Sequence, residues 1–490
     1  MLNKEDRKNA SAVCKHWRQN VFHPKWWPTM TFKIEQNKIE KAKFYIHTFG
    51  RLATEAKIKL NSLSVECMEE FIHLLQILRE NNNLRSFVIE PSHCRFEAPS
   101  KIIGNSDDPW NIMKLLRPCL PKLSTFSIGC IEDLTYFLDD ILKGLSPSKV
   151  THLGLASVKD DPVKYEVAYF DPKMIARFTK LKVLSIDYDQ LSDEFLYNLE
   201  AVKELERLVV HLHSIQENHP STSNRAWDNF RQSHPNCEFR LTIIHAFNDI
   251  KNIHETVMRR CMPLTHLKVF FCENVNLELI QNLSSHYGET LRSIMWVDSL
   301  SHNDNSWVFV KPLFDESPDP FVLAAWLCKN LEEFVLYGYK YWEENLVAIG
   351  RLRGENLKKL EIAENDVIFN PGPNLEDALL VFVKSTVTSE ETCNNTNACP
   401  VKIDQRASRS SSQSLNQEPG LPQPDPPRPI LLAFFPGPIV DGAMWVTDIP
   451  KSLQKPWKPT QQTELHPVIC NPTDGDSDEY LLPIVLADLH

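Results

Sequence analysis

The chain has 490 residues, of which 42% are hydrophobic and 24% charged, which is enough for two or three folded units. Its net charge of −11 argues against nucleic acid as a partner, because phosphate binding needs clustered lysine and arginine. No apolar run is long enough to span a bilayer, and no apolar leader is present, so we expect neither membrane insertion nor secretion.

The twelve cysteines are scattered along the chain and include no Cys-x-x-Cys pair. Cysteines in apolar surroundings, such as Cys130 and Cys328, are typical of buried thiols in a reducing compartment. We therefore expect a cytoplasmic or nuclear protein.

Residues 1–32 are predicted to form a small helical module. The apolar residues at helical spacing are Ala12, Val13, Trp17, Val21 and Phe22. Pro24 ends this helix, and Trp26 and Trp27 follow it. Three tryptophans within eleven residues form a large apolar set, which suits either an anchor for a partner or a small helical core.

From residue 84 onward, a pattern of the form Leu-x-x-(Leu/Ile/Phe)-x-apolar recurs, with copies starting 24 to 40 residues apart. The copies are Leu84–Ile89, Leu123–Ile128, Val150–Leu155, Leu181–Ile186, Leu205–Val210, Leu264–Val269, Leu291–Trp296, Leu331–Leu336 and Leu357–Ile362, with a weaker one at Asn236–Leu241. The fourth and sixth positions are apolar and alternate with polar neighbours, which predicts a half-buried strand in each copy.

Helical segments accompany these strands. An additional strand is expected at Lys57–Leu60, and helices are expected at Met68–Glu80, Asp193–Leu205, Asn252–Met262, Leu277–Tyr287, Pro320–Lys329 and Trp342–Arg353. No single copy can bury its apolar face alone, whereas stacked copies share one core. We therefore predict an α/β fold, a leucine-rich repeat solenoid of about ten strand–helix units over residues 33–370.

The regular pattern stops near residue 375, and from about residue 388 the composition shifts to serine, asparagine, glutamine and proline. Residues 371–490 are therefore expected to be a proline- and serine-rich, largely disordered tail.

We find no sequence motif for a nucleophile elbow, a phosphate-binding loop, a dinucleotide fold or a zinc peptidase. His211 and His213 lie two apart on a predicted strand without further ligands nearby, so surface histidines are favoured over a metal pair. The sequence thus predicts no catalytic residue, metal ligand or cofactor.

A binding surface is predicted instead. The third and fifth positions of each repeat point away from the core, and in stacked parallel strands they line the concave face that solenoids use for binding. The substrate-face candidates at these positions are Thr125, His152, Arg207, His266, Lys268 and Lys359.

The N-terminal residues resemble the second half of an F-box. The resemblance lies in Asp6-Arg7, the run Val13–Arg18 (VCKHWR) and the Pro-x-x-Trp that ends at Trp27. Later segments resemble the F-box-only protein 33 subfamily, namely Asp319–Trp326, Tyr337–Trp342 and Asn345–Gly354. The first, Leu-Pro-containing helix of the family's module has no counterpart, so we expect a partial F-box with weakened affinity for its adaptor.

The resemblance implies binding to Skp1 in a cullin-containing ubiquitin ligase, with an unidentified protein substrate held on the solenoid. The implied Skp1 contacts are Val13, Cys14, Trp17, Val21, Phe22 and Trp27. The chain would act as a non-catalytic substrate receptor, which brings its target close to the ligase. A leucine-rich repeat scaffold without a ligase link is the alternative, and a hydrolase has almost no support in the motifs.

Overall fold

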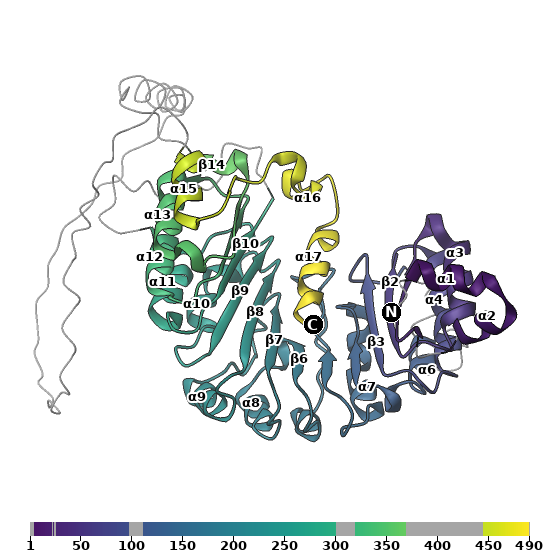
Figure 1. Cartoon of the computed structure of the whole chain (residues 1–490). Helices are drawn as coiled ribbons and strands as arrows, with labels where there is room; N and C mark the ends of the chain where they lie inside the picture. The colour runs from purple at the N-terminus through teal and green to yellow at the C-terminus, as the bar shows by residue number, and fades with distance from the viewer. Residues whose placement is uncertain are drawn as a thin grey trace, which may run out of the picture. The chain divides into compact units, whose positions relative to one another are not determined.

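Parallel strands form one sheet in which the order of the strands is their order in the chain (Figure 1). The computed structural model describes residues 4–21, 23, 26–97, 111–299, 319–368 and 444–489. The twelve strands described in this sheet are β1 (Thr29–Ile34), β2 (Glu55–Leu60), β3 (Ser86–Pro91), β4 (Thr125–Ser127), β5 (His152–Gly154), β6 (Val183–Asp187), β7 (Arg207–Leu212), β8 (Glu238–Ile244), β9 (Leu264–Phe270), β10 (Ser293–Val297), β11 (Glu333–Tyr337) and β13 (Lys359–Ile362). A small second sheet pairs β12 (Tyr341–Trp342) with β14 (Val367–Ile368).

The repeat pattern predicts the sheet in detail. Every predicted copy contains one strand. Except between β8 and β9, the fourth positions of neighbouring copies lie opposite each other, as Phe87 with Phe126 and Leu153 with Leu184. These side chains are buried in one continuous core. The parallel strand–helix solenoid predicted from the sequence is confirmed.

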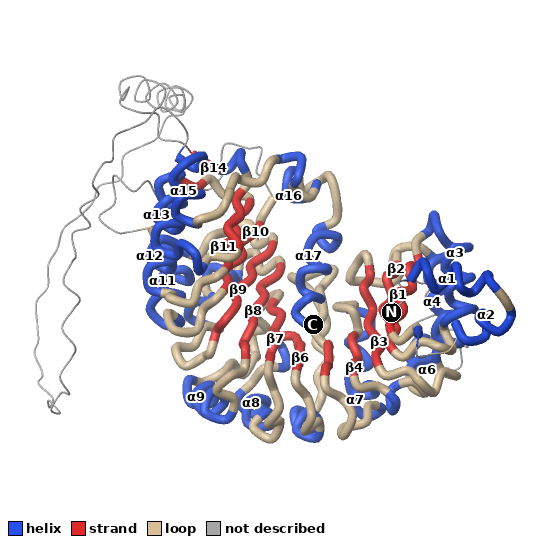
Figure 2. Tube along the Cα trace, viewed as in Figure 1, coloured by secondary structure: helices blue, strands red, loops and turns tan. Residues whose placement is uncertain are grey.

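Helices and short 3-10 helices lie on the outer face of the sheet (Figure 2). The α-helices are α3 (Ile39–Phe49), α4 (Val65–Leu78), α6 (Ile112–Leu116), α7 (Leu138–Gly144), α8 (Asp193–Leu199), α9 (Asn224–Ser233), α10 (Ile253–Thr256), α11 (Leu277–Tyr287), α12 (Pro320–Leu327) and α13 (Glu343–Arg353). The 3-10 helices are η2 (Gln36–Lys38), η3 (Leu120–Lys122), η4 (Glu132–Phe137), η5 (Pro172–Arg177), η6 (Tyr188–Gln190), η7 (Asp249–Lys251), η8 (Gly354–Asn356) and η9 (Glu364–Asp366).

Side-chain caps fix where several of these helices begin. Ser64, Ser192, Ser223 and Asn276 each accept a hydrogen bond from a backbone amide of the first turn that follows. These caps satisfy amides that lack a partner within the helix. The chain can therefore leave a strand, turn sharply and start a helix within a few residues.

The N-terminal module differs from the single helix that the sequence predicts. Two short helices, α1 (Lys4–Val13) and α2 (Lys15–Val21), are separated at Cys14. Arg18 Nε donates to Ser11 O at 3.0 Å and ties the two helices together. β1 then begins at Thr29, so the sheet starts within the range predicted for the F-box.

The last part of the predicted tail is folded, which corrects the expectation for residues 444–489. These residues form α15 (Met444–Leu453), η10 (Gln462–Glu464), α16 (Pro467–Cys470), α17 (Ser477–Leu486) and η11 (Ala487–Leu489). Ile449 and Leu453 of α15 join the main core, and Trp457 Nε1 donates to Leu360 O of β13 at 2.7 Å. The remainder of the predicted tail, 371–443 and residue 490, lies outside the described residues.

Residues 444–464 thus close the C-terminal edge of the sheet. Thr460 forms a parallel bridge with Ala363 just beyond β13, and Arg351 Nη2 of α13 lies 2.9 Å from the Asp448 carboxylate. A solenoid needs such a cap because its last repeat has no neighbour to cover its core. Among the described residues, no helix has the length and apolarity needed to cross a membrane.

Candidate binding surface on the concave face

The predicted substrate-face residues lie in a row on one side of the sheet. The strands are parallel and in register, so outward positions of neighbouring strands stand side by side. Thr125 lies opposite His152, His152 opposite Val183, and Val183 opposite Arg207. All lie on the face away from the main core, which is the concave face in Figure 1.

A β-bulge between β8 and β9 shifts this row. Phe239 lies opposite Leu264, whereas the next residue, Arg240, lies opposite His266. Arg240 therefore takes the place beside His266 that a regular ladder would give to Glu238. Beyond the bulge the row continues through His266 and ends at Lys359 of β13.

The C-terminal segment of the chain covers much of this face. We call residues 465–489 the covering segment. A second apolar cluster lies between it and the concave face, separate from the main core. The sheet contributes Val183, Ile244, Phe270, Met295, Val297, Val335 and Tyr337, and the covering segment contributes Val468, Ile469, Leu481, Leu482, Val485, Leu486 and Leu489.

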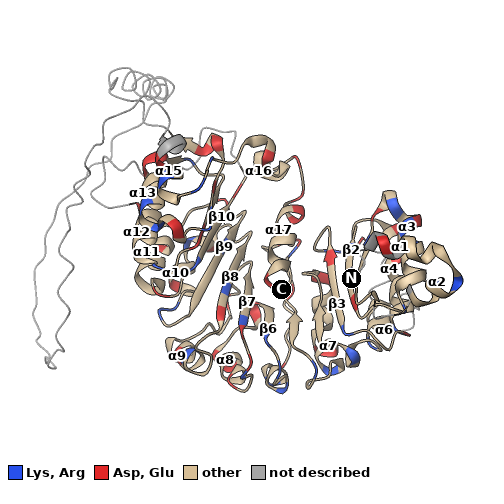
Figure 3. Ribbon diagram, viewed as in Figure 1, with Lys and Arg blue, Asp and Glu red and all other residues tan. Residues whose placement is uncertain are grey.

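Asp488 is the centre of a charged contact between the covering segment and the sheet. Figure 3 shows where acidic and basic residues lie along the strands and helices. Its carboxylate lies 2.7 Å from Lys268 Nζ and 2.5 Å from Arg240 Nη1, and its backbone oxygen accepts a hydrogen bond from Arg207 Nη1 at 2.9 Å. Glu238 accepts from Arg207 Nε at 3.0 Å and from Arg240 Nη2 at 2.7 Å. The positive charges of Arg207, Arg240 and Lys268 are therefore balanced by two carboxylates of the same chain, those of Asp488 and Glu238.

The pKa of Asp488 reflects this surrounding. Burial alone would raise the pKa, since the residue is only 2% exposed, but the charges of Lys268 and Arg240 outweigh burial and hold the pKa below the ordinary aspartate value. Asp488 is thus charged at neutral pH. Removing it would leave Arg240 and Lys268 partly buried without this carboxylate partner.

The other end of α17 is held by polar contacts to the loop after β3. The Asp478 carboxylate accepts a hydrogen bond from the backbone amide of Cys94 at 2.7 Å, and His93 Nε2 lies 3.3 Å from Asp476 Oδ2. Ligand atoms of His93, Asp476 and Asp478 lie within 4.8 Å of one another, as do those of His93, Cys94 and Asp160. Among the described residues these are the groups that could share a metal ion.

His211 lies on β7 and His213 directly follows that strand, and both are buried, not surface histidines as predicted. His211 Nδ1 lies 3.1 Å from Ser157 O. Burial lowers the pKa of both histidines. They are therefore neutral, buried side chains, and His213 packs near the ring of Tyr165.

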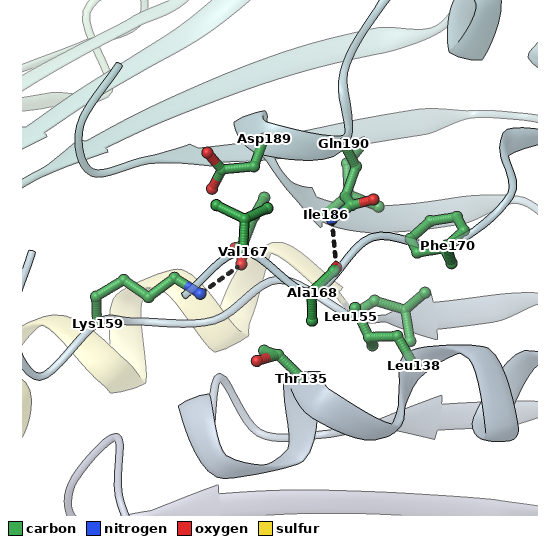
Figure 4. Close-up of a pocket in the computed structure, with 11 residues that line it drawn as sticks. Thr135, Leu138, Leu155, Lys159, Val167, Ala168, Phe170, Ile186, Asp189 and Gln190 are labelled. Carbon is green, nitrogen blue, oxygen red and sulfur yellow. Dashed lines mark hydrogen bonds and ion pairs between the residues drawn. The ribbon is translucent and has the colours of Figure 1, made fainter. Parts of the chain in front are cut away.

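A polar cluster beside these histidines is satisfied internally. Ser157 Oγ donates to Asp187 at 2.6 Å, and Lys159 Nζ lies 3.2 Å from the same carboxylate. Next to it is a cavity of about 10 Å³ whose lining includes Lys159, Asp189 and Gln190 (Figure 4). Such a volume holds about one water molecule, so this cavity has no room for a metabolite.

The Skp1-contact candidates fall into two groups. Val13, Cys14 and Trp17 lie on or between α1 and α2 and are exposed, Trp17 by 51%. The side chains of Val21 and Phe22 lie outside the described residues. Val13 and Trp17 are thus large apolar side chains exposed on the N-terminal module.

Trp27 differs from the other candidates. It is only 4% exposed and packs on Phe49 with ring centroids 4.6 Å apart. It belongs to the core beneath β1 and α3, because the chain has already entered the first repeat at this point. A role for its side chain in direct contact with Skp1 is therefore wrong for this conformation.

Sequence reasoning missed Glu238 and Arg240 as parts of the concave face, and it missed Asp488 as the residue that contacts them. The first two occupy the third and fifth positions of the weak copy Asn236–Leu241, so the repeat register contained that signal. Val183, Met295 and Val335 are apolar at outward positions, which is typical of a sheet face that is covered. Nothing in the repeats themselves identified which segment covers it.

No family model matches the chain. F-box only protein 33 of Homo sapiens is 22% identical over 418 residues, which span 75% of this chain and 75% of the relative. F-box only protein 33 of Mus musculus is 22% identical over 423 residues, which span 75% of this chain and 74% of the relative.

Solved structures resemble the chain more distantly. An internalin (InlF) of Listeria monocytogenes has a TM-score of 0.26 and 11% identity, covering 65% of this chain and 75% of that one. TLR13 in its ssRNA13 complex has a TM-score of 0.27 and 10% identity, and the match covers 70% of this chain and 53% of that one. At these scores the fold assignment rests on the strand order and register described above. The relatives confirm the resemblance seen in the sequence: the chain is homologous to F-box only protein 33 over three quarters of its length.

Proposed function

We propose that the chain is the substrate-recognition subunit of an SCF (Skp1–cullin–F-box) E3 ubiquitin ligase. It would hold a target protein on the concave face of the solenoid for ubiquitination and proteasomal degradation. The homology to F-box only protein 33 over three quarters of both chains is the observation that carries this proposal. The chain itself would be non-catalytic, and its contribution would be to raise the local concentration of the target at the ligase.

The N-terminal module supplies a surface that fits the proposal. Val13 and Trp17 are large apolar side chains exposed on two short helices, and Cys14 lies between them. Exposed tryptophans are frequent anchors of protein interfaces because they bury much area at low entropic cost. We propose this surface as the Skp1 contact, with the cullin recruited through Skp1.

The chemistry of the cysteines supports a cytoplasmic or nuclear location. All ten cysteines in the described part of the chain are free, and most are buried. Burial raises the pKa of Cys119 and Cys328 to about 11 and about 12, which makes these thiols unreactive. Unpaired, inert thiols are typical of a reducing compartment.

A second candidate function is a leucine-rich repeat scaffold without a ligase link. The burial of Trp27 favours it, because one of the residues implied as a Skp1 contact serves the solenoid core instead. The concave face would then bind a protein partner in the same way, but α1 and α2 would only cover the N-terminal end of the sheet.

Binding to purified Skp1 tests the proposal and separates it from the scaffold. We expect Skp1 to co-purify with the full chain, and Trp17→Ala to weaken that binding by about thirtyfold, the effect of losing a hot-spot side chain. Trp326→Ala is the matched control, since Trp326 is 40% exposed on α12, far along the chain from the module. Absence of Skp1 binding, or equal losses in the two variants, would establish the scaffold instead.

A further inference from the structure

α17 lies against the sheet as a helical peptide ligand would. Its residues face the sheet at a regular spacing, and the buried positions in α17 and η11 are Asp478, Leu481, Leu482, Val485, Leu486, Asp488 and Leu489. Glu479, Pro483 and Ala487 on the other side are exposed. This is the helix-in-groove mode, in which apolar residues one turn apart anchor an amphipathic helix.

The sheet is complete without this helix. No residue of the covering segment belongs to the main core, whose side chains come from the strands, the outer helices and residues 444–457. No residue of α17 or η11 joins a described strand ladder. The covalent connection to α16 is an exposed turn that includes Thr473, Asp474 and Gly475. α17 and η11 are thus added to a finished solenoid.

The contact is also specific. Gly154 of β5 leaves a hollow on the concave face, where a Cβ would lie 2.6 Å from Leu489 Cδ1. Beside this hollow, Asp488 meets Arg240 and Lys268 through its carboxylate and Arg207 through its backbone oxygen. The space at Gly154 fits a leucine, and the three cations fit an acidic residue directly before that leucine.

We infer that residues 477–489 occupy the substrate site of this protein as an internal ligand. The site accepts, from a target protein, an apolar helical segment that ends in an acidic residue followed by leucine. The identification of the external ligand as a ubiquitination target rests on the proposed function, but the internal occupancy and the chemistry of the site do not. The apolar side chains at outward positions match the apolar residues of such a ligand. Arg207, Arg240 and Lys268 match its acidic residue.

Internal occupancy sets a threshold for external ligands. A tethered ligand acts at an effective concentration on the order of millimolar, so a free segment of equal intrinsic affinity competes poorly. A target therefore gains access when it binds more tightly than residues 477–489, or when it presents several copies of the segment.

The experiment uses the full chain and a fluorescent synthetic peptide of residues 474–489, with Skp1 absent. Asp488→Arg places a third cation beside Arg240 and Lys268 and should release the helix. We expect the released chain to bind the peptide about a hundredfold more tightly than the wild type, because the tethered competitor is gone. Asp474→Arg in the chain is the matched control, since it makes the same charge change in the exposed turn.

Hydrogen exchange shows whether release has occurred without loss of the solenoid. The expected result for Asp488→Arg is fast exchange over 477–489 with unchanged protection of the sheet strands. A peptide carrying Asp488→Arg should not bind. If Asp488→Arg also unfolds the sheet, the milder Leu489→Ala, which empties the hollow at Gly154, is measured in the same way.

Three results would overturn the inference. They are continued protection of 477–489 in both variants, loss of protection across the sheet in both, and release of the helix without gain in peptide binding. Skp1 binding is measured separately, so the inference and the proposed function can fail independently.

Discussion

The Tyr339 hydroxyl donates a hydrogen bond to the carboxylate of Asp298 inside the turns that follow β10 and β11. The backbone amide of Glu273 also donates to Asp298 Oδ2, at 3.1 Å. Burial nevertheless dominates and raises the pKa of Asp298 to about 7. The hydrogen bonds favour the charged form of the carboxylate but do not offset its desolvation.

This carboxyl group should make stability depend on pH. Its pKa is higher in the folded chain than the ordinary value of about 3.9, so its contribution is complete below about pH 4 and is lost as the pH rises to about 7. We expect wild type to lose stability relative to Asp298→Asn over this range, as measured by urea unfolding at pH 4.5, 6 and 7.5. Asp161→Asn, at an exposed aspartate, is the control; a difference that does not change with pH would contradict the assignment.

The repeat register predicts which leucines carry the fold. Leu267 is fully buried at the fourth position of its repeat, whereas Leu277 begins α11 and is 40% exposed. We expect Leu267→Ala to lower the free energy of unfolding by about 2–5 kcal/mol, and Leu277→Ala by less than about 0.5 kcal/mol. Thermal or urea unfolding of both variants measures this, and equal losses would show that the register is wrong.

The strands could be predicted from sequence because the pattern repeats. A strand core residue such as Leu267 or Leu360 is identified by its place in a copy, and every further copy strengthens the prediction. β1 could not be found in this way, since Thr29–Ile34 lacks the leading leucine of the later copies. Helices such as α8 were predicted too long, because only tertiary packing decides where the helix ends and the chain turns back to the sheet.

The covering segment was missed for a different physical reason. α17 contains an internal proline, Pro483, and the segment has no internal repeat, so its composition favours disorder. Its order comes from contacts with strands more than 200 residues earlier, such as that of Asp488 with Lys268. Such contacts leave no local pattern in the sequence.

The cap formed by α15 should be needed by the last repeats. Ile449 is buried in the main core, whereas Lys451 on the same helix is exposed. We expect Ile449→Ala to cost about 2–5 kcal/mol and to increase hydrogen exchange first in β11 and β13, because terminal repeats lose the neighbour that covers them. Lys451→Ala should have little effect. Unchanged exchange in β13 of the Ile449→Ala chain would show that α15 is not a structural cap.

Gly154 should control the docking of η11. An added Cβ would lie 2.6 Å from Leu489 Cδ1 and 2.9 Å from Ser127 Oγ, so Gly154→Ala forces at least one neighbour to move, at a cost of about 1–3 kcal/mol. Leu489 is the neighbour that can leave, because it lies on a segment outside the main core. We expect faster hydrogen exchange over residues 477–489 and unchanged exchange in β4, β5 and β6. Gly475→Ala is the matched control, since a Cβ there would meet only ordinary contacts at 3.8 Å. Equal exchange of residues 477–489 in the two variants would show that the hollow at Gly154 does not hold Leu489.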